Sequence, residues 1–418
     1  EAVKSYKAAL KLKPDFAGAY NKLGSSLLEL DQLDESVRSY EAALKHKPDY
    51  VEAINNLGIA FYKLQQIDDA MKYYKRALAL DPDFADAHNN IGIVYLDLGQ
   101  LDEAAQSYKA ALKLKPEFVE AHYNLGVVLQ DLGQIEDAIE SYKDVIAIDK
   151  GFFKAHNNLG VALLDLDQFD EAVKSYKAAL ELKPDYVEAI NNLGIAFFKL
   201  HQLDDAVKCY ERALVLDPVS ADAHNNIGAV HLERGQLDEA VNSYKTALEI
   251  KPDFFEANNN IGSAFNKLLQ PQLAIEYYEK SIAIKPDYVN AHANLAIVLK
   301  DFKRFDEVMA IYQSDIILNS NLDFILGEVL HTKMMLCIWD DFQIHLNELT
   351  IKINNNEKAV GPFALLALID DPEIQRKTAE IYVNEHYPKN DILPEIGLYL
   401  KHSKIRIGYF SADFKKHP

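Results

Sequence analysis

Cysteine, tryptophan and basic charge are scarce in this sequence, and each shortage narrows the class of protein. The 418 residues include one tryptophan and two cysteines, Cys209 and Cys337, which lie far apart along the chain. Two distant thiols do not make the disulfide framework of a small secreted domain. A reducing compartment is the simpler interpretation, and we therefore predict a cytoplasmic location.

Basic side chains are outnumbered by acidic ones. Lys and Arg total 44 and Asp and Glu total 64, which leaves a formal net charge of −20. Nucleic acids and anionic membranes require a basic surface on a partner, so we expect neither. Long apolar runs are also missing, because no stretch approaches the roughly 20 residues of a membrane-spanning helix. The balance favours basic or neutral polypeptide partners.

What the sequence does contain is a period of 34 residues, visible in its prolines and glycines. The prolines on this ladder are Pro14, Pro48, Pro82, Pro116, Pro184, Pro218, Pro252 and Pro286, with Lys150 in place of the missing one. The glycines are Gly24, Gly58, Gly92, Gly126, Gly160, Gly194, Gly228 and Gly262, with Ala296 last. A period of this length, built from two helical patterns, is the signature of the tetratricopeptide repeat.

One copy of the repeat, residues 85–116, indicates how each period folds. Apolar residues recur at helical spacing in its first half and again in its second half, which predicts two amphipathic helices, A and B. Gly99 is placed to end helix A, and the closing proline ends helix B. Because Gly92 and Ala104 are small, we expect the two helix backbones to approach closely there. The Tyr108 ring then fills the gap toward neighbouring helices.

Such a hairpin buries its apolar face only by stacking on further copies. The fold predicted is therefore all-α, a right-handed superhelix of tetratricopeptide helical hairpins. It should cover residues 1–320, with a half repeat at 1–16 and nine repeats that start from residue 17. The half repeat also suggests that the chain starts inside a longer array. Repeat positions are numbered below so that Ala17, and each residue one period later, is position 1.

The repeat pattern ends near residue 320, and residues 321–403 predict a helical transition region. The helices expected there cover 322–339, 341–353 and 372–387. Residues 404–410 are rich in β-branched and aromatic side chains, which predicts a strand. A lone parallel strand would leave its backbone groups without partners. We therefore expect residues 404–418 to be the first strand and loop of an α/β domain that the chain does not contain.

The strongest candidate for a binding site is a column of asparagines at position 6, on helix A. A carboxamide offers a donor and an acceptor together, so a ladder of them could hold the backbone of an extended peptide of any sequence. The alternative is that these side chains only bond neighbouring loops or water. We favour binding, because asparagine is a mediocre helix former that helix packing does not call for. The column is Asn56, Asn90, Asn124, Asn158, Asn192, Asn226, Asn260 and Asn294, preceded by Lys22 in the first repeat.

Two further columns have simpler explanations. The acids at position 2 suit the first turn of a helix, and a preference of the groove for basic or hydroxyl-rich peptides is the weaker interpretation. The histidines at position 4 occur once per repeat rather than at metal-ligand spacing, so we predict a packing role and no metal site. The acids are Glu52, Asp86, Glu120, Glu188, Asp222 and Glu256, and the histidines are His88, His122, His156, His224 and His292.

Two segments of the tail resemble the O-GlcNAc transferases of glycosyltransferase family 41. Residues 337–342, CIWDDF, resemble the Cys-x-Trp-x-Asp-aromatic segment that follows the repeats in that family. Residues 405–418, IRIGYFSADFKKHP, resemble the opening of its catalytic domain, in which Ser411, Asp413, Phe414 and His417 match the motif. The chain is thus similar to bacterial O-GlcNAc-transferase-like and SPINDLY-like proteins, truncated at the start of the catalytic domain.

The resemblance implies a parent enzyme that transfers GlcNAc from UDP-GlcNAc, or fucose from GDP-fucose, to Ser and Thr hydroxyls. Its catalytic part would be two Rossmann-like domains of the GT-B type, and His417 would match an active-site histidine. The superhelix would bind extended protein substrates along its concave face, which helix A lines in this family, and self-association as a homodimer is known there. This chain alone would bind no cofactor and would be inactive. The alternative is a stand-alone scaffold for protein–protein interaction.

Overall fold

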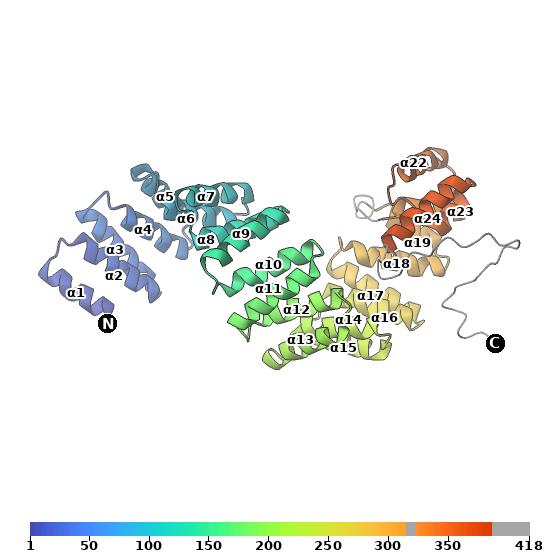
Figure 1. The fold of residues 1–418 in the computed structure, drawn as a ribbon, viewed down its shortest axis with the longest axis horizontal. Coiled ribbons are helices and arrows are strands. Elements are labelled where there is room, and N and C mark those ends of the chain that lie inside the picture. Colours follow the sequence, from blue (N-terminus) through green and yellow to red (C-terminus); the bar gives the residue numbers. More distant parts are fainter. Residues whose placement is uncertain (315–322, 387–418) are drawn as a thin grey trace, which may run out of the picture. The chain divides into compact units, whose positions relative to one another are not determined.

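The computed structural model describes residues 1–314 and 323–386. Within these ranges the chain forms 23 helices and no strands (Figure 1). The predicted all-helical fold of stacked repeats is thereby confirmed. The strand expected over 404–410, the loop that follows it and His417 lie outside the described residues and stay predictions.

Helices alternate between the A and B types that the sequence pattern predicts, after a single helix α1 (Ala2–Leu12). The A helices are α2 (Ala17–Glu29), α4 (Val51–Lys63), α6 (Ala85–Asp97), α8 (Val119–Asp131), α10 (Phe153–Asp165), α12 (Val187–Lys199), α14 (Ala221–Glu233), α16 (Phe255–Lys267) and α18 (Val289–Asp301). The B helices are α3 (Leu33–His46), α5 (Ile67–Leu80), α7 (Leu101–Leu114), α9 (Ile135–Ile148), α11 (Phe169–Leu182), α13 (Leu203–Leu216), α15 (Leu237–Ile250), α17 (Pro271–Ile284) and α19 (Phe305–Tyr312).

The turn between helices A and B requires a left-handed residue at position 15. Gly99 has φ of 70° there, and its N–H donates to the Leu96 carbonyl at 2.9 Å, so the predicted role of Gly99 is confirmed. Other repeats place a side chain in this left-handed conformation, as at Asp31 (φ 57°) and Leu269 (φ 58°). Left-handed backbone is unfavourable for residues with a Cβ atom. The stack therefore tolerates strain at turns where the sequence has no glycine.

The glycine at position 8 makes room for the tyrosine at position 24 of the same hairpin. A Cβ atom built on Gly92 would lie 2.6 Å from the Tyr108 ring, and the other repeats of residues 17–284 show the same clash. Tyr108 is fully buried. The ring lies against helix A of its own hairpin and belongs to an apolar cluster that includes Leu125 and Val128 of the next repeat, as expected of a side chain that fills the gap toward neighbouring helices. At Gly262 the added Cβ atom would also lie 3.2 Å from the Ala274 carbonyl oxygen of helix B, so the helix backbones approach closely there as well.

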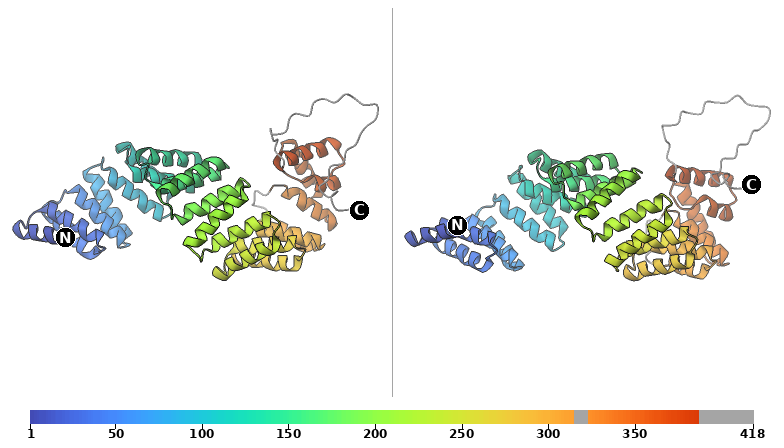
Figure 2. Two further views of the ribbon diagram at one scale, coloured as in Figure 1. Left: turned by 60° about the horizontal axis from the view of Figure 1, so that its bottom comes forward. Right: turned by 90° about the horizontal axis from the view of Figure 1, so that it is seen from below.

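The chain divides into two compact units, residues 1–284 and 285–418. In the first unit the hairpins stack in sequence order, as the blue-to-yellow progression in Figure 2 shows. Their buried faces form apolar clusters that run from repeat to repeat, the largest from Ala104 to Val230. This division by contacts differs from the repeat-based boundary at residue 320, because the ninth hairpin, α18 and α19, falls in the second unit.

The second unit continues with α21 (Ile325–Met335), α22 (Phe342–Asn354), α23 (Pro362–Leu368) and α24 (Pro372–His386). Three of these match the helices expected over 322–339, 341–353 and 372–387. The short α23 was not expected, because residues 361–362, Gly-Pro, read as a loop, whereas Pro362 is the first residue of the helix. A separate core around Leu330, Leu349 and Leu365 holds these helices together.

Candidate functional site: an asparagine-lined groove

The position-6 asparagines are half-buried on their A helices, and most of them bond across a repeat boundary. In each bond the side-chain amide donates to the position-5 side chain of the preceding repeat. The bonds between amides are Asn56 to Asn21 (3.1 Å), Asn90 to Asn55 (3.0 Å), Asn124 to Asn89 (3.5 Å), Asn192 to Asn157 (3.2 Å) and Asn260 to Asn225 (3.0 Å).

The position-5 asparagines are a second column that the sequence analysis did not single out. Asn157 is fully buried and Asn55 and Asn89 are nearly so. A buried carboxamide needs partners, and the position-6 amide of the next repeat supplies one. The signal was present in the sequence as a repeated Asn-Asn pair, but only stacking shows that the two members act in different repeats.

These bonds orient the position-6 side chains without exhausting them. One N–H of each amide is used, whereas the Oδ1 atoms of Asn56, Asn90, Asn124 and Asn192 accept no hydrogen bond from any residue that the structure describes. An asparagine can make up to four hydrogen bonds. The column therefore keeps acceptors and donors for a ligand while its side chains are held in place by the neighbouring repeat.

In the position-5 column, a tyrosine, Tyr123, replaces the asparagine of one repeat. Asn158 donates to the Tyr123 hydroxyl at 3.2 Å, and the Tyr123 ring lies 5.1 Å from that of Phe152. Nearby, Glu188 is held on both oxygens: it accepts 2.9 Å hydrogen bonds from the Asn157 amide and the Tyr186 hydroxyl. Burial and this carboxylate raise the pKa of Tyr186.

A groove with a volume of about 490 Å³ shows which columns come together. It crosses the first three repeats of the first unit and brings amides, acids and aromatic rings to one surface. Position 6 contributes Asn56 and Asn90 as predicted, and position 2 contributes two acids. The lining residues are Asn21, Lys22, Tyr50, Glu52, Asn55, Asn56, Ile59, Phe84, Asp86 and Asn90. The aromatic residues at position 34, Tyr50 and Phe84, were not predicted to line it.

The remaining members of the column stand as follows. Asn226 does not donate to Asn191, whose Oδ1 atom is buried without a hydrogen-bond partner among the described residues. Asn226 instead accepts from the amide of Asn225 at 3.5 Å. Asn294 lies half-buried on α18, in the second unit. The predicted catalytic residue His417 lies beyond the part of the chain that the structure describes.

The position-4 histidines bond to the backbone. The Nε2 atoms of His88 and His122 lie 3.2 Å and 2.8 Å from the carbonyl oxygens of Pro82 and Pro116, and His292 makes the same contact with Pro286. These contacts fit the packing role predicted for them. Across residues 1–314 and 323–386, no group of three or more His, Cys, Asp or Glu side chains could hold a metal ion.

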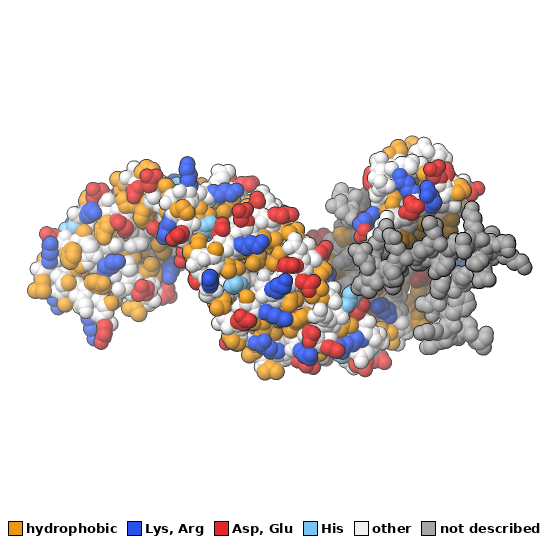
Figure 3. Space-filling view, in the orientation of Figure 1, with side chains coloured by type: hydrophobic (Ala, Val, Ile, Leu, Met, Phe, Trp, Pro, Cys, Tyr) orange, Lys and Arg blue, Asp and Glu red, His pale blue; other side chains and the backbone are white. Residues whose placement is uncertain are grey.

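Charge and hydropathy add little to the site. Acidic and basic side chains are interspersed over the repeats on the face shown in Figure 3. No helix in the described ranges is both long enough and apolar enough to span a membrane. The Cys209 thiol is half-buried, and burial raises its pKa to about 11, which favours the thiol over the nucleophilic thiolate near neutral pH.

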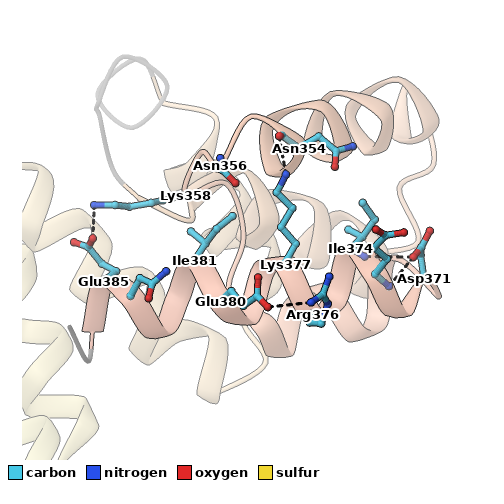
Figure 4. Close-up of a pocket in the computed structure, with 12 residues that line it drawn as sticks. Asn354, Asn356, Lys358, Asp371, Ile374, Arg376, Lys377, Glu380, Ile381 and Glu385 are labelled. Atoms are coloured by element: carbon cyan, nitrogen blue, oxygen red, sulfur yellow. Dashed lines mark hydrogen bonds and ion pairs between the residues drawn. The ribbon is translucent and has the colours of Figure 1, made fainter. Parts of the chain in front are cut away.

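The second unit has a hollow of its own, with a volume of about 750 Å³, beside α24 (Figure 4). Most of its charged side chains are engaged with one another or with backbone. Lys377 donates to the Asn354 carbonyl at 2.7 Å, Arg376 pairs with Glu380, and Lys358 pairs with Glu385. These contacts join α22, the following loop and α24. We therefore interpret the polar side chains of this hollow as contacts that hold the helices together rather than as a binding site.

Solved structures of repeat proteins resemble parts of the chain. A structure of MamA is 28% identical and has a TM-score of 0.35, with 39% of this chain and 95% of that chain covered. YrrB, a tetratricopeptide protein with an unusual peptide-binding site, is 24% identical and has a TM-score of 0.35, with 45% of this chain and 96% of that chain covered. A structure of the APC/C hetero-tetramer Cut9–Hcn1 is 17% identical in sequence and has a TM-score of 0.49, with 68% of this chain and 56% of that chain covered. No curated protein matches the chain.

Family models of the repeat match most of the first unit. The model described as TPR repeat matches residues 1–31, 24–65, 60–99, 92–133 and 162–201. Two models described as tetratricopeptide repeat match residues 191–253 and 230–289, and 119–152. Together they span more than half of the chain, within the region of the 34-residue period. The chain therefore belongs to the tetratricopeptide-repeat family.

Proposed function

We propose that the first unit binds an extended polypeptide along the surface lined by its A helices. The observation that carries this proposal is the groove itself, where Asn56 and Asn90 meet the acids Glu52 and Asp86. A scaffold for protein–protein interaction is the general function that tetratricopeptide repeats support.

The chemistry of the groove favours recognition of backbone. At Asn56, Asn90, Asn124 and Asn192 the amide is oriented by one bond to the preceding repeat and the carbonyl oxygen stays available. A peptide backbone presents N–H and C=O groups at regular spacing whatever its side chains are. A regular column of carboxamides can therefore hold many sequences, and the acids at position 2 would add a preference for basic residues.

The finer proposal is that this surface recruits protein substrates for an O-glycosyltransferase of the O-GlcNAc transferase type, with UDP-GlcNAc as the donor of the parent enzyme. It is supported by the resemblance of residues 337–342 and 405–418 to that family. A stand-alone scaffold is supported equally well, because the family matches concern only the repeats. The gene beyond Pro418 separates the two: a long α/β segment would support the enzyme, and a stop codon would exclude it.

Peptide binding is tested by replacing Asn158, Asn192 and Asn226 together with alanine. The probe is a fluorescein-labelled extended peptide rich in Ser, Thr and Arg, and its affinity is measured by fluorescence anisotropy. We expect a loss of at least about tenfold, since each lost hydrogen bond contributes roughly 0.5–1.5 kcal/mol. Unchanged affinity of the folded variant would remove the asparagine column from the proposal.

Two controls isolate the backbone contacts. Gln106, Lys174 and Asn242 are exposed and all stand at position 22, on B helices, so their triple replacement by alanine should leave affinity unchanged. A probe N-methylated at alternate residues lacks half of its backbone donors and should bind the native chain more weakly. The asparagine variant should show a smaller penalty for N-methylation, because the acceptors are already lost.

A further inference from the structure

The junction between α13 and α14 lacks the aromatic residue that stands at position 34 elsewhere in the first unit. Ser220 occupies that position, where the other repeats have Tyr50, Phe84, Phe118, Phe152, Tyr186 and Phe254. This exception changes the packing between repeats, because the position-34 residue lies between one hairpin and the next.

Two well-buried examples show what the aromatic ring does. Phe118 is 6% exposed and belongs to a small cluster with Ala85, Ala111 and Ala121. Phe254 is 5% exposed and packs with the equivalent alanines of its own junction, Ala221, Ala247 and Ala257. In both cases the ring fills the space between helices A and B of one repeat and helix A of the next. A ring in this place opposes rotation of one hairpin against the other.

At the α13–α14 junction this ring is exchanged for a helix cap. The Ser220 hydroxyl accepts a hydrogen bond from the Ala223 N–H at 3.3 Å, which caps α14. The hydroxyl is too small to fill the space between the hairpins.

The hydrogen bond of the asparagine column is also missing at this junction. By the pattern of the other repeats, Asn226 would donate to Asn191. Among the residues that the structure describes, the Asn191 Oδ1 atom is instead buried without a partner, and Asn226 accepts a bond from Asn225 of its own helix. Two contacts that couple neighbouring repeats, one apolar and one polar, are thus absent at the same place.

We propose that the α13–α14 junction is a hinge of the first unit. The stacks α1–α13 and α14–α17 change their mutual angle about residues 217–220, which widens or narrows the surface that the A helices form. Ala213, Ala223 and Val230 remain in the continuous apolar core, so the stacks stay joined while they bend. Hinges commonly lie at the ends of elements, where few contacts resist a change in backbone angles.

Spin labels on matched residues test the hinge. With Cys209 replaced by alanine and Cys337 by serine, labels are placed at the exposed position-22 residues Lys174 and Asn242, which flank the junction. The control pair, Gln106 and Lys174, spans the same number of repeats and excludes the junction. Double electron–electron resonance should give a distance distribution about twofold broader for the first pair. Equal widths would overturn the proposal.

Substitutions at Ser220 distinguish the effect of the missing aromatic ring from the effect of the helix cap. Ser220→Phe restores the ring of the other repeats and should narrow the 174–242 distribution to the width of the control pair. Ser220→Ala removes the cap without supplying a ring and should leave it broad. If Ser220→Phe keeps the broad distribution in a protein with native helicity, the missing ring is not the cause of the bending. If it fails to fold, the comparison of the two pairs in the parent protein still decides.

Discussion

At the scale of single residues, the asparagine pair at positions 5 and 6 links each repeat to its neighbours by hydrogen bonds. Asn157 and Asn158 are adjacent in sequence but serve different neighbours. Asn157 receives a bond from Asn192, one repeat ahead, whereas Asn158 donates to Tyr123, one repeat behind. A carboxamide is suited to this because it is a donor and an acceptor at once. The same pair thus contributes to cohesion and to the candidate binding surface.

The buried tyrosines at position 24 differ in whether their hydroxyls are satisfied, and this predicts opposite effects of one substitution. The Tyr108 hydroxyl is buried without a partner among the described residues, whereas the Tyr142 hydroxyl donates to Gln130 at 3.2 Å. An unpaired buried hydroxyl is costly, and a paired one contributes roughly 0.5–1.5 kcal/mol.

We therefore expect Tyr108→Phe to raise the free energy of unfolding by up to about 1 kcal/mol and Tyr142→Phe to lower it by a similar amount. Urea denaturation followed by circular dichroism measures both. The two variants lose the same atom from equivalent places in neighbouring repeats. Equal effects of both changes would show that these hydrogen-bond assignments do not govern the energetics.

At the scale of the elements, each hairpin depends on a ring that lies on a glycine. A Cβ atom on Gly160 would lie 2.6 Å from Cε1 of Tyr176, and Tyr176 is fully buried and has no space to move. Overpacking of this kind costs roughly 1–3 kcal/mol. The glycine is thus required by the packing of the two helices, although glycine weakens a helix considered alone.

The expected result of Gly160→Ala is a loss of about 1–3 kcal/mol in the free energy of unfolding, measured by chemical denaturation. The double variant with Tyr176→Leu should recover part of it, because the smaller side chain frees space. Gly18→Ala is a control in the first turn of α2. Its Cβ atom would meet only the half-exposed Phe16 ring at 3.1 Å, so it should be neutral or stabilising. A large loss at Gly18 would contradict the packing argument.

At the scale of the whole molecule, we expect the stability of the second unit to depend on pH through a buried histidine. His331, in the second unit, has an Nδ1 atom that is buried without a partner among the described residues. Burial, followed by the Lys300 ammonium, lowers the pKa of His331 from its usual 6.5. The folded unit therefore holds this side chain neutral, whereas the unfolded chain takes up a proton first as the pH falls.

The stability contributed by neutral His331 should be full above pH 6.5 and should decline as the pH falls from 6.5 through the lowered pKa of the folded state. The single tryptophan, Trp339, lies in the second unit and reports its unfolding by fluorescence. His331→Gln should flatten the decline in that range. A decline of equal slope in the variant would assign the effect to other groups.

Much of this architecture was predictable, and particular residues show the limit. The proline ladder and Gly99 placed the helices and turns correctly, because both residues act through local backbone geometry. Asn89 was overlooked, because its role depends on a partner in another helix, the Asn124 amide of the next repeat, which local spacing does not specify.

The sequence by itself determined the period, the hairpins and the columns that run along them, because a fixed spacing on a helix defines its faces whatever surrounds it. Tertiary structure decided which residues of different helices meet. It placed the Asn192 amide on Asn157, 35 residues away, and brought Tyr50 and Asp86 into one groove. Such contacts depend on how neighbouring hairpins stack, and stacking is set by the shapes of the side chains between them.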